Sequence, residues 1–123
     1  MKIYVCNAFS LSMLDREIQR HRVGDAVYEN PRIPRPCDDP VAFLDGHERY
    51  GAEVASAVGH ADTAAVFAAV LGRPVPVNRI SVRLVGESLA LVGQVVRPDG
   101  GPYRLPEGST ALPDDAVIEW WTV

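Results

Sequence analysis

The chain of 123 residues has the size of one ordinary domain, residues 1–123, and can bury a core without disulfides or metal ions. Its 12 Lys and Arg against 16 Asp and Glu give a net charge of -4, which argues against a protein that coats long nucleic acid. An anionic ligand must therefore meet a local cluster of donors. No apolar run approaches bilayer length and no signal-peptide core follows Met1, so we expect a cytoplasmic protein outside the membrane.

The basic residues are almost all arginine, since Lys2 is the only lysine. Arginine suits bidentate contacts to phosphate or carboxylate, although a GC-rich genome would produce the same bias. Cys6 and Cys37 have no Cys or His at metal-site spacing, so we interpret both as free thiols in a reducing compartment. The sequence predicts neither a metal site nor a cofactor.

The first third of the chain predicts one clear strand and one short helix. Lys2 to Cys6 alternates in a β-rich pattern and ends at Asn7, and residues 7–10 then favour a turn. A strand is expected within Val23 to Tyr28 and a proline-rich loop within Glu29 to Asp38. Asp39 and Pro40 form an N-cap and first-position pair for a helix that runs through Leu44 and is closed by Gly46.

His47, Glu48 and Arg49 are expected in an exposed turn after that helix, and His21 on the solvated surface. His21 has no partner at catalytic or metal-site spacing, and His47 is not chosen as a site residue because of the exposed turn expected there.

The middle of the chain carries the clearest candidate site. Glu53 to Val58 predicts a buried strand, Gly59-His60 a tight turn, and Thr63 to Leu71 a helix that Gly72 stops. His60 is therefore expected at or just before a helix N-terminus. Unpaired N–H groups and the helix dipole make that place a seat for phosphate, to which an imidazole could donate a proton.

The last third predicts strands and one irregular segment. Alternation over residues 80–84 favours a half-exposed strand that begins after Arg79, followed by a hairpin turn at Val85 to Ser88 and a central strand from Leu89 to Val96. A loop at residues 98–102 leads to Arg104 and Glu107, which form either part of a site or an exposed local ion pair.

The C-terminal residues, from Ala116 to Val123, alternate as a last strand. Trp120 and Trp121 must point to its opposite faces. One tryptophan in the core and one at an interface would satisfy this, and so would an edge strand packed beneath a helix. We thus expect an α/β or α+β fold: one small domain with a mixed central sheet of about five to six strands flanked by short helices.

Four separated pieces of the chain occur together in the order of a known family. They are Asn7-Ala8-Phe9-Ser10 with Met13-Leu14, Ala57-Val58-Gly59-His60 followed by Thr63, Leu71-Gly72 through Val77-Asn78-Arg79, and Arg104-Leu105-Pro106-Glu107-Gly108. This ordered set resembles the small type III anti-CRISPR ring nucleases, a family found in archaeal viruses, phages and bacteria. Residues 15–52 match that family only loosely, and the loop from Val96 to Pro102 is longer than in the viral members.

The resemblance implies a homodimer that cleaves cyclic tetra-adenylate, the second messenger of type III CRISPR systems, without metal. The product is linear di-adenylate with a 2′,3′-cyclic phosphate, so CRISPR ancillary effectors are switched off. By position, His60 would be the general acid with Glu107 near it as a second catalytic residue. The residues that would hold ribose and phosphates are Asn7, Ser10, Arg79 and Arg104.

Two further readings stay open at the level of sequence. The chain could be a non-catalytic sponge or sensor that binds a cyclic oligonucleotide through Arg79, Arg104 and the His60 turn. It could also be a structural or interaction domain in which His60 only caps a helix, since likeness of fold does not guarantee function. The residues do not determine the size of the cyclic substrate, nor whether the protein serves a virus or a host.

Overall fold

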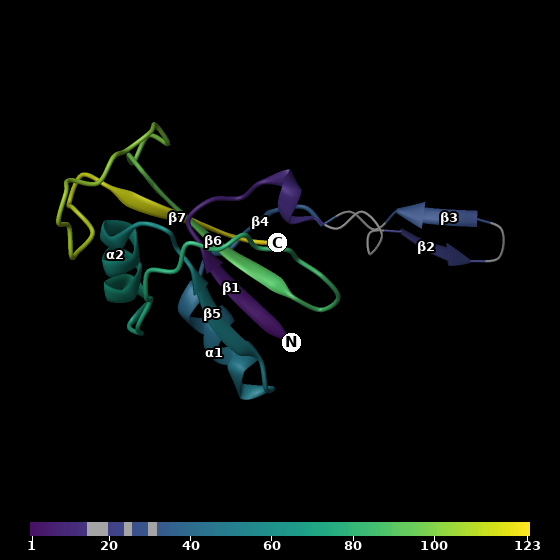
Figure 1. Cartoon of the computed structure of the whole chain (residues 1–123). Helices are drawn as coiled ribbons and strands as arrows, with labels where there is room; N and C mark the ends of the chain where they lie inside the picture. The colour runs from purple at the N-terminus through teal and green to yellow at the C-terminus, as the bar shows by residue number, and fades with distance from the viewer. Residues whose placement is uncertain (15–19, 24–25, 30–31) are drawn as a thin grey trace.

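The protein folds around one mixed sheet of five strands, as the sequence predicts (Figure 1). The structure, a computed structural model, describes residues 1–14, 20–23, 26–29 and 32–123, and the side chains of residues 1–14 and 32–123. The sheet order is β4-β7-β6-β1-β5, with β1 parallel to both β5 and β6, and β7 antiparallel to both β6 and β4. The bounds are β1 Lys2–Cys6, β4 Arg35–Pro36, β5 Glu53–Ala57, β6 Leu89–Val96 and β7 Val117–Thr122.

The strand expected within Val23 to Tyr28 is instead an antiparallel pair. It consists of β2, Arg20–Val23, and β3, Ala26–Glu29, which form a separate two-stranded sheet. Residues 24 and 25, and the side chain of His21, lie outside the described residues, so the expectation for His21 is not tested.

The predicted loop over Glu29 to Asp38 contains one short strand, β4, at the edge of the main sheet. Arg35 and Pro36 pair with the end of β7, and the Cys37 N–H donates to the Trp120 carbonyl at 2.8 Å. An edge strand tolerates a proline because one of its sides needs no partner. The many prolines of this segment led to the prediction of a loop, although they are compatible with an edge strand. Residues 30 and 31 lie outside the described part.

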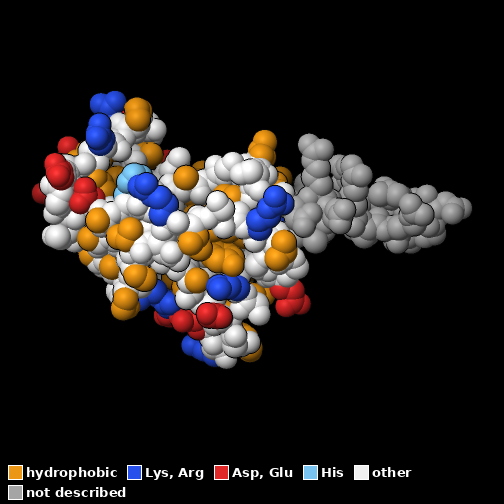
Figure 2. Space-filling model, in the orientation of Figure 1, with side chains coloured by type: hydrophobic (Ala, Val, Ile, Leu, Met, Phe, Trp, Pro, Cys, Tyr) orange, Lys and Arg blue, Asp and Glu red, His pale blue; other side chains and the backbone are white. Residues whose placement is uncertain are grey.

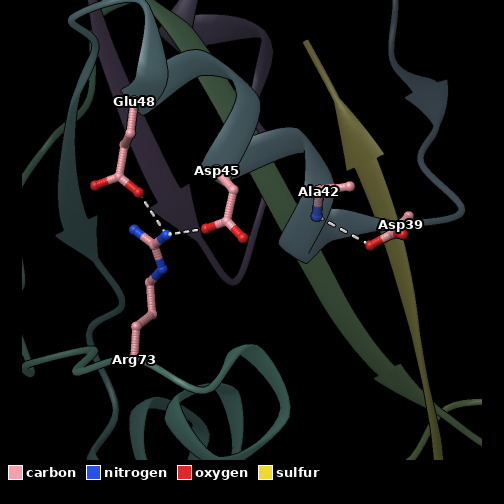
Figure 3. Close-up of polar contacts among 5 residues, drawn as sticks. All are labelled: Asp39, Ala42, Asp45, Glu48 and Arg73. Atoms are coloured by element: carbon pink, nitrogen blue, oxygen red, sulfur yellow. Dashed lines mark hydrogen bonds and ion pairs between the residues drawn. The ribbon is translucent and has the colours of Figure 1, made fainter.

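The first helix, α1, spans Pro40–Arg49, so the expected stop at Gly46 is wrong. Its start is as predicted, because the Asp39 carboxylate accepts the Ala42 N–H at 3.0 Å (Figure 3). A helix-interior glycine costs only about 1 kcal/mol. The buried Leu44 side chain on the preceding turn offsets that cost. His47 to Arg49 consequently form the last helical turn rather than a turn after the helix, and Glu48 and Arg49 are exposed as expected.

Arg73, just beyond the second helix, ties the two helices together. Its Nη2 lies 2.5 Å from Glu48 Oε1 and 3.1 Å from Asp45 Oδ1 on α1 (Figure 3). The second helix, α2, spans Ala61–Leu71 and ends at Gly72, whose φ of 66° supplies the left-handed cap that a glycine adopts without strain. The predicted position and end of this helix are confirmed.

Both helices contribute to a core on one face of the sheet. Ile3 and Val5 of β1 and Leu91 of β6 pack there with Leu44 of α1 and Phe67 of α2. The opposite face carries a second cluster that includes Cys6, Met13, Leu84, Ala90 and Val92. This alternation along β1 and β6 follows from the period of two in a strand.

Gly93 in the middle of β6 allows the largest rings of the core to approach the sheet. A Cβ at this position would lie 2.6 Å from Trp120 Cζ3 and 2.7 Å from Phe67 Cζ. The centroids of the Phe67 and Trp120 rings are 4.8 Å apart. Trp120 is buried in this core, whereas Trp121 is half-buried against the second cluster, which confirms their opposite faces.

The strand predicted over residues 80–84 is not formed. Leu84 makes an isolated parallel bridge to Leu14, and its N–H donates to the Met13 carbonyl at 2.7 Å. Val82 and Leu84 nevertheless face the second cluster, so the alternation reflects a segment laid over the sheet rather than a strand within it. The turn after it is confirmed, with the Ser88 N–H bonded to the Val85 carbonyl.

Candidate functional site

Two adjacent parallel strands, β1 and β5, end level with each other, and candidate residues follow both of them. Asn7 comes directly after β1, and Gly59-His60 follow β5, the neighbour of β1. β6, on the other side of β1, runs past the end of β1 and adds Gly93 and Gln94 from its middle. Carboxyl ends of parallel strands are a recurrent place for ligands, because the connections leave a crevice there.

β5 differs from the buried strand that was expected. It lies at the edge of the sheet, and four of its five residues are half-buried. Val58, one residue beyond it, is fully buried and makes an isolated bridge with Val77. The chain after α2 therefore protects this end of the edge strand.

His60 occupies the N-cap position of α2. Its backbone is extended, with φ -122° and ψ 133°, and its carbonyl accepts the Ala64 N–H at 2.9 Å. Its side chain makes no capping hydrogen bond and is exposed. The imidazole thus stands at the positive end of the helix dipole and is available to a ligand.

Four hydrogen bonds hold the segment of Arg79 against the end of β5. Ser56 Oγ donates to the Pro76 carbonyl at 2.6 Å, while the Asn78 backbone N–H donates to Val58 O and its Nδ2 to Ser56 O, both at 2.8 Å. Arg79 Nη2 donates to the Gly59 carbonyl at 3.3 Å. The guanidinium is therefore fixed beside the residue that precedes His60.

Ser10 has a structural task at the rim of the site. It is the N-cap of a 3-10 helix, Leu11–Met13, and its Oγ accepts the Ser12 N–H at 3.3 Å. Its own N–H donates to Met13 Sδ at 3.3 Å. Ser10 is exposed, so its hydroxyl can also meet a ligand while it holds the turn.

Two adjoining cavities meet at Asn7 and His60, and five of the six predicted site residues line them. The larger, about 570 Å³, is lined by Ser10, Arg79 and Arg83 besides Asn7 and His60, and we call it the Arg79 cavity. The smaller, about 370 Å³, is lined by Tyr103, Arg104, Gln94, Thr63 and Asp62 besides the shared pair, and we call it the Tyr103 cavity. Both volumes fall in the range of small-molecule sites.

The Arg79 cavity is basic although the whole chain is acidic. Arg79 and Arg83 are its charged side chains, and no Asp or Glu is among the described residues that line it. Figure 2 shows a histidine side chain directly beside a basic side chain on the exposed face. Fixed arginines next to a helix N-terminus favour an anion such as a phosphodiester.

Glu107 is the predicted site residue that does not line either cavity. It stands at the tip of a turn closed by the Ser109 N–H to the Pro106 carbonyl at 3.1 Å, in which Gly108 has φ 81°. The backbone N–H of Gly108, the residue after Glu107, donates to Asp62 Oδ1 at 3.0 Å. The described structure contains no ion pair between Arg104 and Glu107, which was the alternative for this segment.

Several residues of the site were not predicted from the sequence. Asp62 lies two positions after His60, so a carboxylate in the first helical turn was a readable signal. Asn78 and Arg83 flank residues that were already singled out, whereas the contact of Tyr103 with Asp115 joins two loops that no sequence pattern connects. Tyr103 OH donates to Asp115 Oδ1 at 2.8 Å, and this bond raises the pKa of the phenol.

The remaining reactive groups lie outside this site or are buried beneath it. Both cysteines are free, as expected, and burial raises the pKa of the Cys6 thiol to about 12. In the part of the chain that the structure describes, no three His, Cys, Asp or Glu side chains are arranged to hold a metal ion. None of the described helices has the length and apolarity needed to cross a bilayer.

The comparisons with known proteins agree with this architecture. Protein B116 of Sulfolobus turreted icosahedral virus has the same fold, with a TM-score of 0.68 and 21% sequence identity over 99% of this chain and 97% of that one. No curated protein matches the chain. The family model described as STIV B116-like matches residues 37–117, a range that includes His60, Arg79, Arg104 and Glu107. The chain belongs to the STIV B116-like family.

Proposed function

We propose that this protein is a homodimeric, metal-independent ring nuclease that cleaves cyclic tetra-adenylate to linear di-adenylate with a 2′,3′-cyclic phosphate. One observation carries the proposal: His60 and Asn7 form the wall shared by two cavities that contain Arg79, Arg83 and Arg104. A phosphodiester at that wall would meet the imidazole and arginines from both sides. The sequence resemblance to ring nucleases supports the same substrate, and cleavage would switch off the effectors that this messenger activates.

The proposed reaction uses a nucleophile from the substrate itself. A ribose 2′-oxygen attacks the adjacent phosphorus and loses its proton to water, so the O2′–P bond forms as the P–O5′ bond breaks. The His60 imidazolium donates its proton to the departing 5′-oxygen. No water is consumed, since the product keeps the phosphate as a 2′,3′-cyclic diester. Alignment of the 2′-oxygen with the bond that breaks is a large part of the acceleration.

The arginines supply the charge that the transition state needs. Arg79 is held by the Gly59 carbonyl, and Arg104 lines the other cavity. Fixed cations on the phosphoryl oxygens stabilise the developing negative charge more than they stabilise the ground state. Arg83 also lines the Arg79 cavity and supplies a third positive charge to the site.

Glu107 has an indirect part in the proposal. It does not line either cavity, so its proposed part is to supply a negative charge to the site from the neighbouring turn. The bond from Gly108 to Asp62 supports this, because it ties that turn to the helix that begins after His60.

A two-fold dimer would match the symmetry of the substrate. A ring of four identical nucleotides can sit on a two-fold axis, and each protomer would then cut one of two opposite linkages. The half-buried Trp121 beside an apolar cavity of about 280 Å³ supports an interface on that face of the sheet.

The proposal is tested with purified protein and labelled cyclic tetra-adenylate in excess EDTA. We expect di-adenylate with a cyclic phosphate end to accumulate over several turnovers. An uncut ring at stoichiometric protein would refute the proposal. Rings of three and six adenylates in the same assay measure the preference for ring size.

The second candidate is a cyclic oligonucleotide binding protein without catalysis. It is favoured by the position of Glu107 outside the cavities and by the absence, in the described structure, of a hydrogen bond that orients the His60 side chain. Tight binding of the ring by wild-type protein without turnover would establish it. The third reading, His60 as only a helix cap, is weakened because its side chain makes no capping bond.

A further inference from the structure

The loop after β6 is a compact turn that returns the chain to the sheet. Arg97 N–H donates to Gly101 O at 2.9 Å, Gly100 N–H to Arg97 O at 2.8 Å, and Gly101 N–H to Asp99 Oδ1 at 2.8 Å. Pro102 then makes an isolated antiparallel bridge with Val96. The loop therefore ends by placing the next residue, Tyr103, beside the carboxyl end of β6.

The Tyr103 side chain is held at the rim of the smaller cavity. It is half-buried, and its hydroxyl donates to Asp115 Oδ1 at 2.8 Å. The acceptor carboxylate raises the pKa of the phenol, so Tyr103 stays a neutral donor through the physiological range. A ring anchored at its far end loses little further freedom when a flat ligand stacks on it.

The two cavities differ in charge, so they suit different parts of a nucleotide. The described lining of the Arg79 cavity carries cations without acids, which suits the sugar-phosphate backbone. The Tyr103 cavity carries Asp62 as well as Arg104, together with the uncharged polar side chains of Gln94 and Thr63. A carboxylate disfavours a second phosphate there, while an aromatic ring with amide and hydroxyl groups is the lining that binds a base.

On the basis of the proposed function, we propose that the Tyr103 cavity is a nucleobase subsite in which the Tyr103 ring stacks on an adenine next to the cleaved linkage. Gln94 and Thr63 offer hydrogen bonds to the edge of that base. His60 and Asn7 belong to both cavities, so a phosphodiester between them has its base on one side and its backbone on the other. Tyr103 is thereby a specificity residue rather than a catalytic one.

The test is a binding measurement with cyclic tetra-adenylate and cyclic tetra-uridylate in the His60→Ala background, which prevents turnover. Tyr103→Ala removes the ring, and we expect adenylate affinity to fall by about 5- to 100-fold, with a smaller loss for uridylate. Tyr103→Phe keeps the ring and is expected to stay within about threefold of the parent. Tyr50→Ala, in which the replaced ring is 89% exposed at the end of α1, is the matched control and should leave both affinities unchanged.

Three results would overturn the subsite: unchanged adenylate affinity in Tyr103→Ala, an equal loss in Tyr103→Phe, or equal losses for the two rings. Thermal unfolding of each variant separates a misfolded protein from a lost contact, and Tyr103→Phe keeps the test decisive where the alanine variant unfolds. Wild-type turnover is measured in parallel. Binding without cleavage refutes the nuclease and leaves the subsite standing, whereas the absence of binding to either ring refutes both.

Discussion

The Asp62 carboxylate accepts the backbone N–H of Gly108 at 3.0 Å, across 46 positions of sequence. This bond ties the turn that presents Glu107 to the first turn of α2, two residues after His60. The glycine is required there because its φ of 81° is unfavourable for other residues. Asp62 is accordingly a positioning residue for the proposed catalytic pair.

We predict that Asp62→Ala lowers kcat by about 10- to 100-fold with little change in KM, because misplacement of about 1 Å is costly to catalysis. Asp62→Asn keeps an acceptor oxygen and should recover most of the rate. Steady-state kinetics on cyclic tetra-adenylate check this, with Asp114→Ala as an exposed acidic control. In a double-mutant cycle with Glu107→Ala the effects should not add. Full additivity would show that Asp62 acts independently of the turn.

Gly93→Ala should destabilise the fold by about 1–3 kcal/mol or more, because the new methyl group collides with two core rings. The ideal Cβ would lie 2.6 Å from the Trp120 ring and 2.7 Å from the Phe67 ring. Urea unfolding measures the loss. Gly46→Ala is the matched control, since nothing lies within 4 Å of a Cβ there and the position is inside α1. The unfolding free energy of that variant should rise by up to about 1 kcal/mol. Equal changes in the unfolding free energy of the two variants would contradict the packing described.

Arg79→Ala should weaken binding of cyclic tetra-adenylate at least about tenfold and reduce the salt dependence of binding, because a charge-assisted phosphate contact is lost. Arg49→Ala removes an exposed arginine at the end of α1 and should have no effect. Titrations at two salt concentrations check both variants. An equal change in the two would show that only net charge matters.

Arg73→Ala should cost at most about 1 kcal/mol at pH 7, because its partners on α1 are largely exposed. Arg73 lowers the pKa of Glu48 below its ordinary value of 4.5. A carboxyl with a lowered folded-state pKa stabilises the fold above its unfolded pKa, and this contribution is lost as pH falls through the folded value.

The difference in unfolding free energy between wild type and Arg73→Ala should therefore be full near neutrality and shrink as pH falls below 4.5, the ordinary pKa of Glu48. Urea unfolding at several pH values gives that difference directly. A difference that stays constant over the range would show that the guanidinium stabilises by packing alone.

The sequence predicts those parts of the fold in which local pattern and burial agree. Lys2 to Cys6 and Leu89 to Val96 are strands with the predicted bounds, since their side chains alternate between two buried clusters. The helix was predicted to pass no further than Gly46 because a glycine is a poor helix former. Burial of Leu44 on that helix decides against this, and such a contact is not local.

The same limit applies to the site. His60 could be placed at a helix N-terminus from the pattern around it, and that placement is confirmed. The positions of Arg79 and of the Glu107 turn relative to it depend on the hydrogen bonds from Arg79 to Gly59 and from Gly108 to Asp62, which link distant parts of the chain. No periodicity encodes such bonds, so the two cavities and their shared wall emerge only from the folded chain.

The most direct test of the proposed nuclease activity is single-turnover cleavage of cyclic tetra-adenylate in EDTA by wild-type protein and by His60→Ala. We expect conversion to di-adenylate with a 2′,3′-cyclic phosphate by the wild type, and a rate at least about 1,000-fold lower in the variant. Binding of the ring should remain within about tenfold, since the arginines are intact. Cleavage by His60→Ala at the wild-type rate would contradict the assignment of His60 as the general acid.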